Sequence, residues 1–156
     1  MVTIAKAISG FRPSVTFAAG SASITAGFES VNYDQTATTK VKQTGYALAA
    51  NFDVAAANVN LAAAFKKDDE TDYKVTSVTA NMTYGNFGLG VISSTNDKKT
   101  GDDPSLLTTY VAYTMPVMDI ENATVTFAGS YSKAKNLAAG DNDKVTAARV
   151  RFNYGF

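Results

Sequence analysis

Two arginines near the C-terminus are the residues whose type and spacing point most directly to a function. Arg149 and Arg151 alternate with apolar residues, and Asn153 continues the alternation. An unpaired guanidinium is too costly to bury among apolar groups, so this side of the segment must face water or a polar interior. Fixed cations there would favour anions in a channel. Alternatively, they could pair with Glu29 and Asn51 and fill a narrow interior.

The composition removes most catalytic chemistry. The chain has no Cys and no His, which excludes thiol nucleophiles, disulfides, imidazole bases and Ser-His-Asp triads. We therefore expect no enzyme activity and no cofactor. Fourteen basic and fourteen acidic residues balance, so no cationic excess exists to bind phosphate backbones, and nucleic acid is not an expected partner.

Two acidic runs have the residue types of a calcium site. Residues 68–72 read Asp-Asp-Glu-Thr-Asp, and residues 141–143 read Asp-Asn-Asp. Calcium takes several oxygen ligands, but neither run has the spacing of an EF-hand loop. We expect solvated loop tips and no metal.

The elements that carry these side chains have a period of two. Alternation of apolar and polar residues over nine to twelve positions is typical of half-exposed β-strands. It predicts eight strands, at residues 21–33, 44–53, 58–67, 74–85, 87–95, 107–115, 123–134 and 145–156. No run approaches the roughly 18 apolar residues of a membrane-spanning helix.

The alternation sorts the side chains into two faces. One face is expected to carry the polar residues Glu29, Asn51, Lys66, Arg149, Arg151 and Asn153. The other is expected to be apolar and to place aromatic rings near strand ends, as in the interfacial girdles of membrane barrels. These rings are Phe52, Phe65, Tyr84, Phe87, Tyr113, Phe127, Tyr131, Phe152, Tyr154 and Phe156. Alternation does not say which face is inside, so a soluble lipocalin-like carrier remains an alternative.

The connections alternate in length. Residues 34–42, 68–73, 97–105 and 136–144 are polar loops, whereas residues 53–57, 85–86 and 116–122 are tighter links. This pattern predicts an all-β, antiparallel, up-and-down transmembrane β-barrel, most simply of eight strands and of eight to ten in all, over residues 21–156. Residues 1–20 form an N-terminal extension or extra strands, with 14–19 and 2–8 as the ninth and tenth.

The polar face is built mainly from small residues such as Ala, Thr, Ser and Gly. An eight-stranded barrel has an interior just wide enough for side chains to fill, and these side chains would leave it underpacked. Small residues suit the gently curved wall of a wider barrel. A fragment of a larger porin wall, or several copies completing one wall, therefore stays open.

The last eight residues, Arg-Val-Arg-Phe-Asn-Tyr-Gly-Phe, resemble the C-terminal assembly signal of Gram-negative outer-membrane barrels. The signal would comprise Val150, Phe152, Tyr154 and Phe156, with the last residue a phenylalanine. Residues 107–135 also resemble the terminal hairpins of general diffusion porins. The resemblance implies export, recognition of the last strand by the barrel-assembly machinery, and localisation in the bacterial outer membrane.

The resemblance also implies a function and partners. A porin-like barrel would allow passive diffusion of ions or small solutes, whereas a non-conducting barrel would be structural or would bind a partner. A classical porin has about sixteen strands, more than 156 residues can supply. The expected partners are outer-membrane lipid and lipopolysaccharide, whose phosphates Lys98 and Lys99 could contact, and another copy of the chain or another membrane protein.

Overall fold

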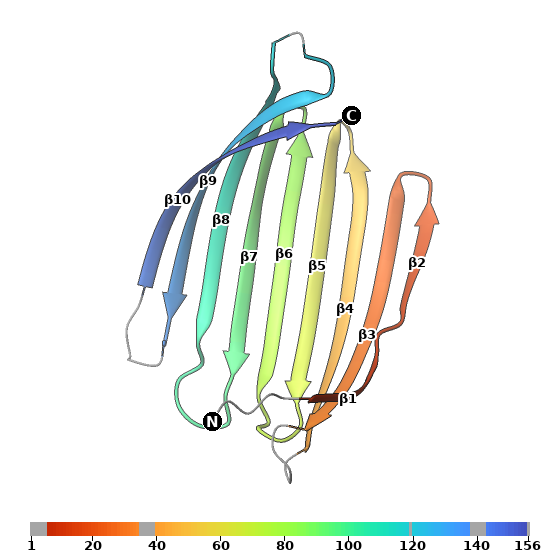
Figure 1. Cartoon of the computed structure of the whole chain (residues 1–156), viewed down its shortest axis with the longest axis vertical. Helices are drawn as coiled ribbons and strands as arrows, with labels where there is room; N and C mark the ends of the chain where they lie inside the picture. The colour runs from red at the N-terminus through yellow and green to blue at the C-terminus, as the bar shows by residue number, and fades with distance from the viewer. Residues whose placement is uncertain (1–5, 35–39, 119, 138–142, 156) are drawn as a thin grey trace.

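The computed structural model describes residues 6–34, 40–118, 120–137 and 143–155, and these form a single antiparallel sheet of ten strands (Figure 1). The strands run in the order β1-β3-β4-β5-β6-β7-β8-β9-β10, and β2 also pairs with β3. Their bounds are β1 Lys6–Phe11, β2 Ser14–Ala19, β3 Ala22–Asp34, β4 Lys40–Val54, β5 Ala57–Asp68, β6 Lys74–Tyr84, β7 Phe87–Asp97, β8 Ser105–Pro116, β9 Ala123–Lys135 and β10 Asp143–Tyr154.

The eight predicted segments correspond to β3–β10, and the first twenty residues add β1 and β2, so the sheet has ten strands, the upper limit of the predicted eight to ten. Both extra strands pair with β3, one after the other along its length. They are separated at Arg12 and Pro13, where a proline cannot donate to the ladder. Its carbonyl still accepts the backbone N–H of Phe28 at 3.0 Å, so the chain stays attached to the sheet.

Three tight turns lie at one end of the sheet, which we call the turn end. They have two residues each, Gly20-Ser21, Ala55-Ala56 and Gly85-Asn86, and the longer connection from β8 to β9, residues 117–122, lies at the same end. Gly20, Ala55 and Gly85 have φ values of 60°, 54° and 55°, as two-residue hairpin turns require. The other connections lie at the opposite end, which we call the loop end.

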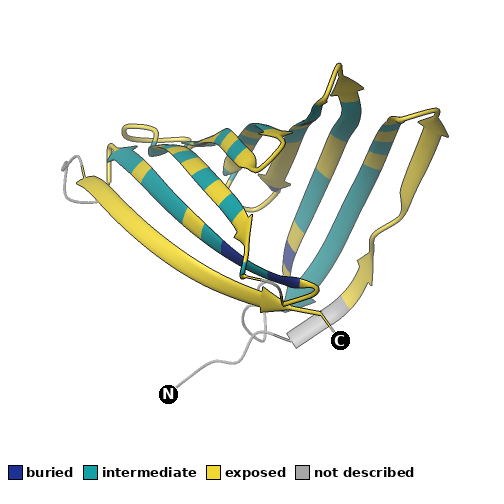
Figure 2. Cartoon of the chain, turned by 90° about the horizontal axis from the view of Figure 1, so that it is seen from above, coloured by how far each residue is buried: buried dark blue, intermediate teal, exposed yellow. Residues whose placement is uncertain are grey.

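The sheet bends into a trough and does not close (Figure 2). In the described part of the chain, β10 pairs only with β9, and neither β1 nor β2 pairs with β10. The prediction of a self-contained closed barrel is therefore wrong for these residues. The reason lies in the small side chains of the polar face, which cannot fill an eight-stranded interior and which suit a wider arc.

The sheet has almost no buried apolar core. Among the described residues, the buried apolar side chains are Val41, Ala123 and Val125, and no large side chain is fully buried. The ten strands are held by their ladders of backbone hydrogen bonds. No helix in the described ranges is long and apolar enough to cross a membrane.

Candidate functional site

The register of the sheet places all six predicted polar residues on one face. Residues directly opposite in an antiparallel pair lie on the same face, and the pairing connects the strands in continuous rows. One row runs from Asn51 through Asn60 and Asn81, and another joins Arg151 through Thr126 to Thr114. The polar face contains Glu29, Asn51, Lys66, Arg149, Arg151 and Asn153.

Nine of the ten predicted aromatic residues lie on the opposite, apolar face. They are Phe52, Phe65, Tyr84, Phe87, Tyr113, Phe127, Tyr131, Phe152 and Tyr154. Three residues of the predicted assembly signal, Val150, Phe152 and Tyr154, also point this way from β10. Phe156 lies outside the described residues.

Burial identifies the apolar face as the convex one. On β8, Leu107, Val111 and Tyr113 are exposed, whereas Thr108 and Ala112, on the other face, are half-buried. Side chains crowd together on the concave side of a curved sheet and separate on the convex side. Apolar residues on the convex face are about half exposed, with Leu48 at 54% and Phe65 at 51%. The trough is therefore polar inside and apolar outside.

The apolar face forms a band with two aromatic levels. On β4 the outward residues from the turn end are Val54, Phe52, Ala50, Leu48 and Tyr46. Phe52 and Tyr46 are separated by six residues, or about 20 Å along the strand at 3.3 Å per residue. At the strand tilt of roughly 40° in outer-membrane barrels this is about 15 Å along the barrel axis, so both rings lie within an apolar belt of roughly 25 Å. Rings at both levels contact across strands: Phe87 and Tyr113 are 4.8 Å apart, and Phe28 and Tyr46 are 5.3 Å apart.

Beyond the aromatic level nearer the loop end, which contains Tyr46, Phe65 and Tyr131, the outward positions become polar and then basic. On β4 they are Thr44, Lys42 and Lys40, and Lys67 follows Phe65 on β5. The same change occurs on β9, where Lys133 follows Tyr131. Apolar residues, then lysines at the loop end, are the order expected of side chains that pass from hydrocarbon to headgroups.

The polar face satisfies its side chains by hydrogen bonds along the rows. Hydroxyl pairs join Thr108 to Ser132 at 2.8 Å and Thr114 to Thr126 at 2.8 Å. The amides of Asn51 and Asn58 bond each other at 3.0 and 3.1 Å. No buried side-chain nitrogen or oxygen in the described ranges lacks a partner. Such a surface is stable in contact with water.

A glycine on β7 makes room for a ring on this face. A Cβ at Gly90 would lie 2.5 Å from the ring end of Tyr110, closer than non-bonded atoms allow. The ring of Tyr110 on β8 therefore lies across Gly90, its direct partner on β7. The period of two in the sequence did not identify this contact.

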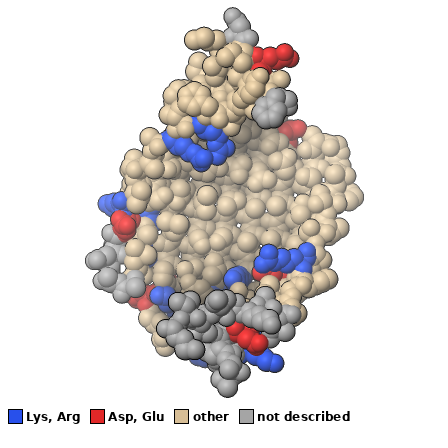
Figure 3. Space-filling view, in the orientation of Figure 1, with Lys and Arg blue, Asp and Glu red and all other residues tan. Residues whose placement is uncertain are grey.

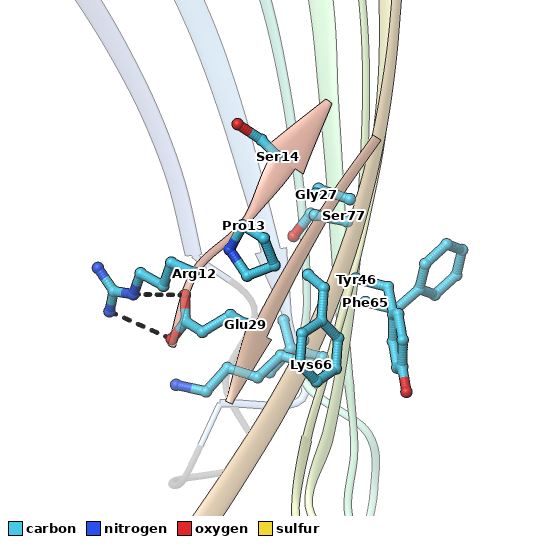
Figure 4. Close-up of a pocket in the computed structure, with 14 residues that line it drawn as sticks. Arg12, Pro13, Ser14, Gly27, Glu29, Tyr46, Phe65, Lys66 and Ser77 are labelled. Carbon is cyan, nitrogen blue, oxygen red and sulfur yellow. Dashed lines mark hydrogen bonds and ion pairs between the residues drawn. The ribbon is translucent and has the colours of Figure 1, made fainter. Parts of the chain in front are cut away.

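The edge of the polar face at β2 and β3 carries an ion pair that the sequence analysis did not predict. Arg12 contacts Glu29 through two nitrogens, with Nε 3.1 Å from Oε2 and Nη2 3.2 Å from Oε1. Figure 4 shows both side chains, with Lys66, on the side away from the rings of Tyr46 and Phe65. The three charged residues border a hollow of about 470 Å³. A signal for this pair was present in the sequence: in a hairpin that turns at Gly20-Ser21, residue 12 lies opposite residue 29.

Arg149 and Arg151 lie on β10, near the other edge of the sheet. Both are exposed, and they oppose Ala128 and Thr126 on β9. Figure 3 shows a broad face whose middle is covered by uncharged side chains, with basic groups toward its ends. The structure does not bring the two arginines to Glu29 and Asn51, because these bond Arg12 and Asn58 instead.

The predicted acidic loop after β5 has a structural role at its first residue. Asp68 is 9% exposed. Its Oδ1 accepts the backbone N–H groups of Glu70 and Thr71, both at 3.1 Å, and its Oδ2 accepts Gln43 Nε2 at 3.1 Å. No group of three or more acidic residues with the geometry of a metal site occurs in the described part of the chain. Asp141 and Asn142 lie outside it.

We expect Asp68→Ala to lower the free energy of unfolding by about 1–3 kcal/mol, because it leaves two turn amides and Gln43 without their acceptor. Asp68→Asn should lose less, because its carbonyl oxygen can still accept the two backbone amides. Urea unfolding of the detergent-folded protein measures both losses. Equal stability of wild type and the alanine variant would show that these hydrogen bonds do not hold the turn.

The rest of this loop is joined to the next one by charge. Lys99 Nζ lies 2.9 Å from Asp72 Oδ2, and Lys67 Nζ lies 3.7 Å from Asp72 Oδ1. The hydrogen bond from Lys99, with the charges of Lys99 and Lys67, lowers the pKa of Asp72 below its ordinary value of 3.8. The carboxylate is therefore charged at every pH above that value, and this contact is lost only in stronger acid.

The sheet resembles solved bacterial outer-membrane proteins. An anion-selective porin from Comamonas acidovorans matches with a TM-score of 0.66 and 13% identity over 94% of this chain and 49% of that chain. OmpT, expressed in the outer membrane of Vibrio cholerae, matches with a TM-score of 0.62 and 15% identity over 92% and 54%. Its in-vitro folded trimer form gives 0.61 and 14% over 90% and 52%.

These comparisons show that the sheet has a fold similar to that of outer-membrane β-barrels. The chain spans about half the length of the structures that it matches. No protein-family model and no curated protein sequence matches the chain. The fold supports the predicted localisation in the bacterial outer membrane.

Proposed function

We propose that the chain forms part of the wall of an outer-membrane barrel through which ions and small solutes diffuse passively. The observation that carries this proposal is the separation of the two faces. The convex face is an exposed apolar band with aromatic rings at two levels, and the concave face is polar and internally hydrogen-bonded. A sheet of this kind is stable with lipid outside and water inside.

The open edges require further strands. In a bilayer, every unpaired backbone N–H and C=O costs several kcal/mol, so only closed barrels span membranes as sheets. The outer edge of β10, and the outer edges of β1 and β2, have no partner strand within the described ranges. Additional strands, from a second copy or from other chain segments, complete the wall. The share of each matched outer-membrane structure that this chain covers, about half, supports this proposal.

The charges on the concave face favour anions. At or within the height of the apolar band, the described part of this face carries Arg12, Lys66, Arg149 and Arg151 against two acids. Of these acids, Glu29 is paired with Arg12, and Asp53 accepts a hydrogen bond from Asn58. Asp68 and Asp143 lie at the strand ends. Fixed cations along a pore lower the free energy of anions within it. The Comamonas porin, which matches this fold, is described as anion-selective.

The last strand is the proposed contact for the barrel-assembly machinery. Val150, Phe152 and Tyr154 present apolar side chains at alternate positions on the exposed face of β10. An apolar strand at the edge of a sheet is suited to pairing with another strand. Together with the C-terminal phenylalanine, these residues are the proposed recognition signal.

Reconstitution tests the proposed function. The protein is folded from urea into phosphatidylcholine vesicles loaded with chloride or with a large polysaccharide. We expect bilayer-inserted β-structure that resists extraction at high pH, release of chloride, and retention of the polysaccharide. Insertion without chloride release would favour a non-conducting, partner-binding barrel. A monodisperse protein in plain buffer that does not insert would contradict the proposal.

The geometry does not favour the soluble-carrier alternative. A lipocalin-like carrier needs its apolar residues inside, around the ligand. Here Leu48, Phe65 and Val111 lie on the convex side and are 54%, 51% and 56% exposed. The concave side is lined instead by hydroxyl and amide groups.

A further inference from the structure

We propose that Lys133, Lys135 and Lys144 form a binding site for the phosphate groups of a lipid headgroup, on the outside of the wall at the loop end. We call these residues the lysine cluster. The inference rests on the proposed function, because it requires the apolar band to lie in a bilayer. It adds a specific lipid contact that the barrel fold alone does not imply.

The register places two lysines of the cluster directly opposite each other. Lys133 on β9 pairs with Lys144 on β10, and Lys135 lies two residues beyond Lys133 on the same face. Like charges in direct cross-strand positions destabilise a sheet. An anion held between the ammonium groups would convert this repulsion into attraction.

A second lysine pair in the same sheet shows how such repulsion is otherwise relieved. Lys67 on β5 pairs directly with Lys74 on β6, also on the convex face. There, Lys67 Nζ lies 3.5 Å from Asp69 and 3.7 Å from Asp72, and Lys74 Nζ lies 3.9 Å from Asp97. The protein supplies its own anions at this pair.

The lysine cluster has no such acids among the described residues. No ion pair joins Lys133, Lys135 or Lys144 to any carboxylate there. The nearest acid in sequence, Asp143, opposes Ala134 on the concave face, and its Oδ1 accepts the backbone N–H of Lys144 at 2.7 Å. Asp103 lies near the end of β9, but its Oδ1 accepts the backbone N–H of Lys98.

The height of the cluster fits a headgroup phosphate. Lys133 is the first outward residue after Tyr131, which belongs to the aromatic level nearer the loop end. Aromatic rings mark the interface between hydrocarbon and headgroups, and lysines just beyond them reach the phosphates. Lys135 and Lys144 are exposed and Lys133 is half-buried on the same face, so a lipid in the adjoining leaflet can approach the cluster from outside.

The probe for this site is lipid A, a diphosphorylated glycolipid, added to the full chain. Charge attraction to an anionic surface contributes roughly fivefold in affinity per lysine, so Lys133→Gln/Lys144→Gln should weaken lipid A binding by about 30-fold. Native mass spectrometry of the protein in neutral detergent, titrated with lipid A, measures the loss. Lys67→Gln/Lys74→Gln is the matched control and should bind nearly as well as wild type.

Stability separates this site from a merely structural role. In pure phosphatidylcholine, Lys133→Gln should raise the unfolding midpoint, because it relieves the like-charge pair. In vesicles with lipid A, the same variant should lower the midpoint relative to wild type. Equal lipid A binding by both double variants, or the same stabilisation by inorganic phosphate alone, would overturn the inference. Failure of every variant and of wild type to insert into neutral vesicles would instead contradict the proposed function.

Discussion

Leu61→Arg is expected to destabilise the bilayer-inserted protein by about 2–4 kcal/mol, the cost measured for arginine at the lipid-facing midplane of membrane barrels. Leu61 is the third of six outward residues on β5, between Ala50 and Ala80 on the neighbouring strands. Its side chain is 43% exposed. At a site exposed to water the same substitution would change stability by about 0.5 kcal/mol or less. The size of the loss therefore shows whether the side chain of residue 61 faces lipid or water.

The neighbouring residue provides the control. Ala62 lies on the concave face, between Ala49 and Thr79. An arginine there would project into the polar trough, so Ala62→Arg should lose much less than Leu61→Arg. Urea-dependent folding into phosphatidylcholine vesicles measures both variants. A larger loss for Ala62→Arg would mean that the two faces are assigned in reverse.

Arg149→Glu/Arg151→Glu is expected to change the ion preference of the assembled pore from anions to cations. The substitution changes the charge of the concave face by four units, whereas Arg12 and Lys66 are the other cations on this face, at the height of the apolar band, among the described residues. A pore lined by fixed charges concentrates the opposite ion and excludes the like one. The reversal potential in a planar bilayer under a potassium chloride gradient should therefore change sign.

The control for this experiment is on the same strand. Thr146 is an outward residue of β10 at the loop end, so Thr146→Glu adds an acid outside the pore and should leave the reversal potential close to that of wild type. An unchanged potential in the arginine variant would show that these side chains do not face the conducting path. A high salt concentration should reduce the effect, because it screens the charges.

The strands could be predicted because each depends on a local pattern. The alternation of Val125, Phe127 and Tyr131 with Thr124 and Thr126 specifies both a strand and its two faces, and the observed register agrees. The short links at 85–86 and 53–57 marked the hairpins at the turn end. Pairing across these hairpins then follows from symmetry about the turn.

The size and closure of the sheet could not be predicted in the same way. Closure depends on how many strands share the curvature, which no single segment encodes. The pattern in residues 14–19 is weak, and Pro13 interrupts the edge, so β1 and β2 were expected only as possible extra strands. The Arg12–Glu29 pair was missed for the same reason, because it exists only when β2 folds back on β3.

The contact between Tyr110 and Gly90 and the two opposed lysine pairs were also missed. Each requires the exact register of neighbouring strands, in which Tyr110 faces Gly90 and Lys133 faces Lys144. The period of two identifies the face of a residue but not its partner. Once the hairpin turns are located, the partner can be counted from the turn.

The most direct test of the central claim is the solvent that each side of the wall contacts. The chain has no cysteine, so single cysteines at residues 59–65 of β5 can carry a nitroxide label one at a time. In vesicles, labels at 59, 61, 63 and 65 should be accessible to oxygen dissolved in lipid, and labels at 60, 62 and 64 to a water-soluble nickel chelate. The opposite alternation, or access of the nickel chelate to every position, would contradict the account.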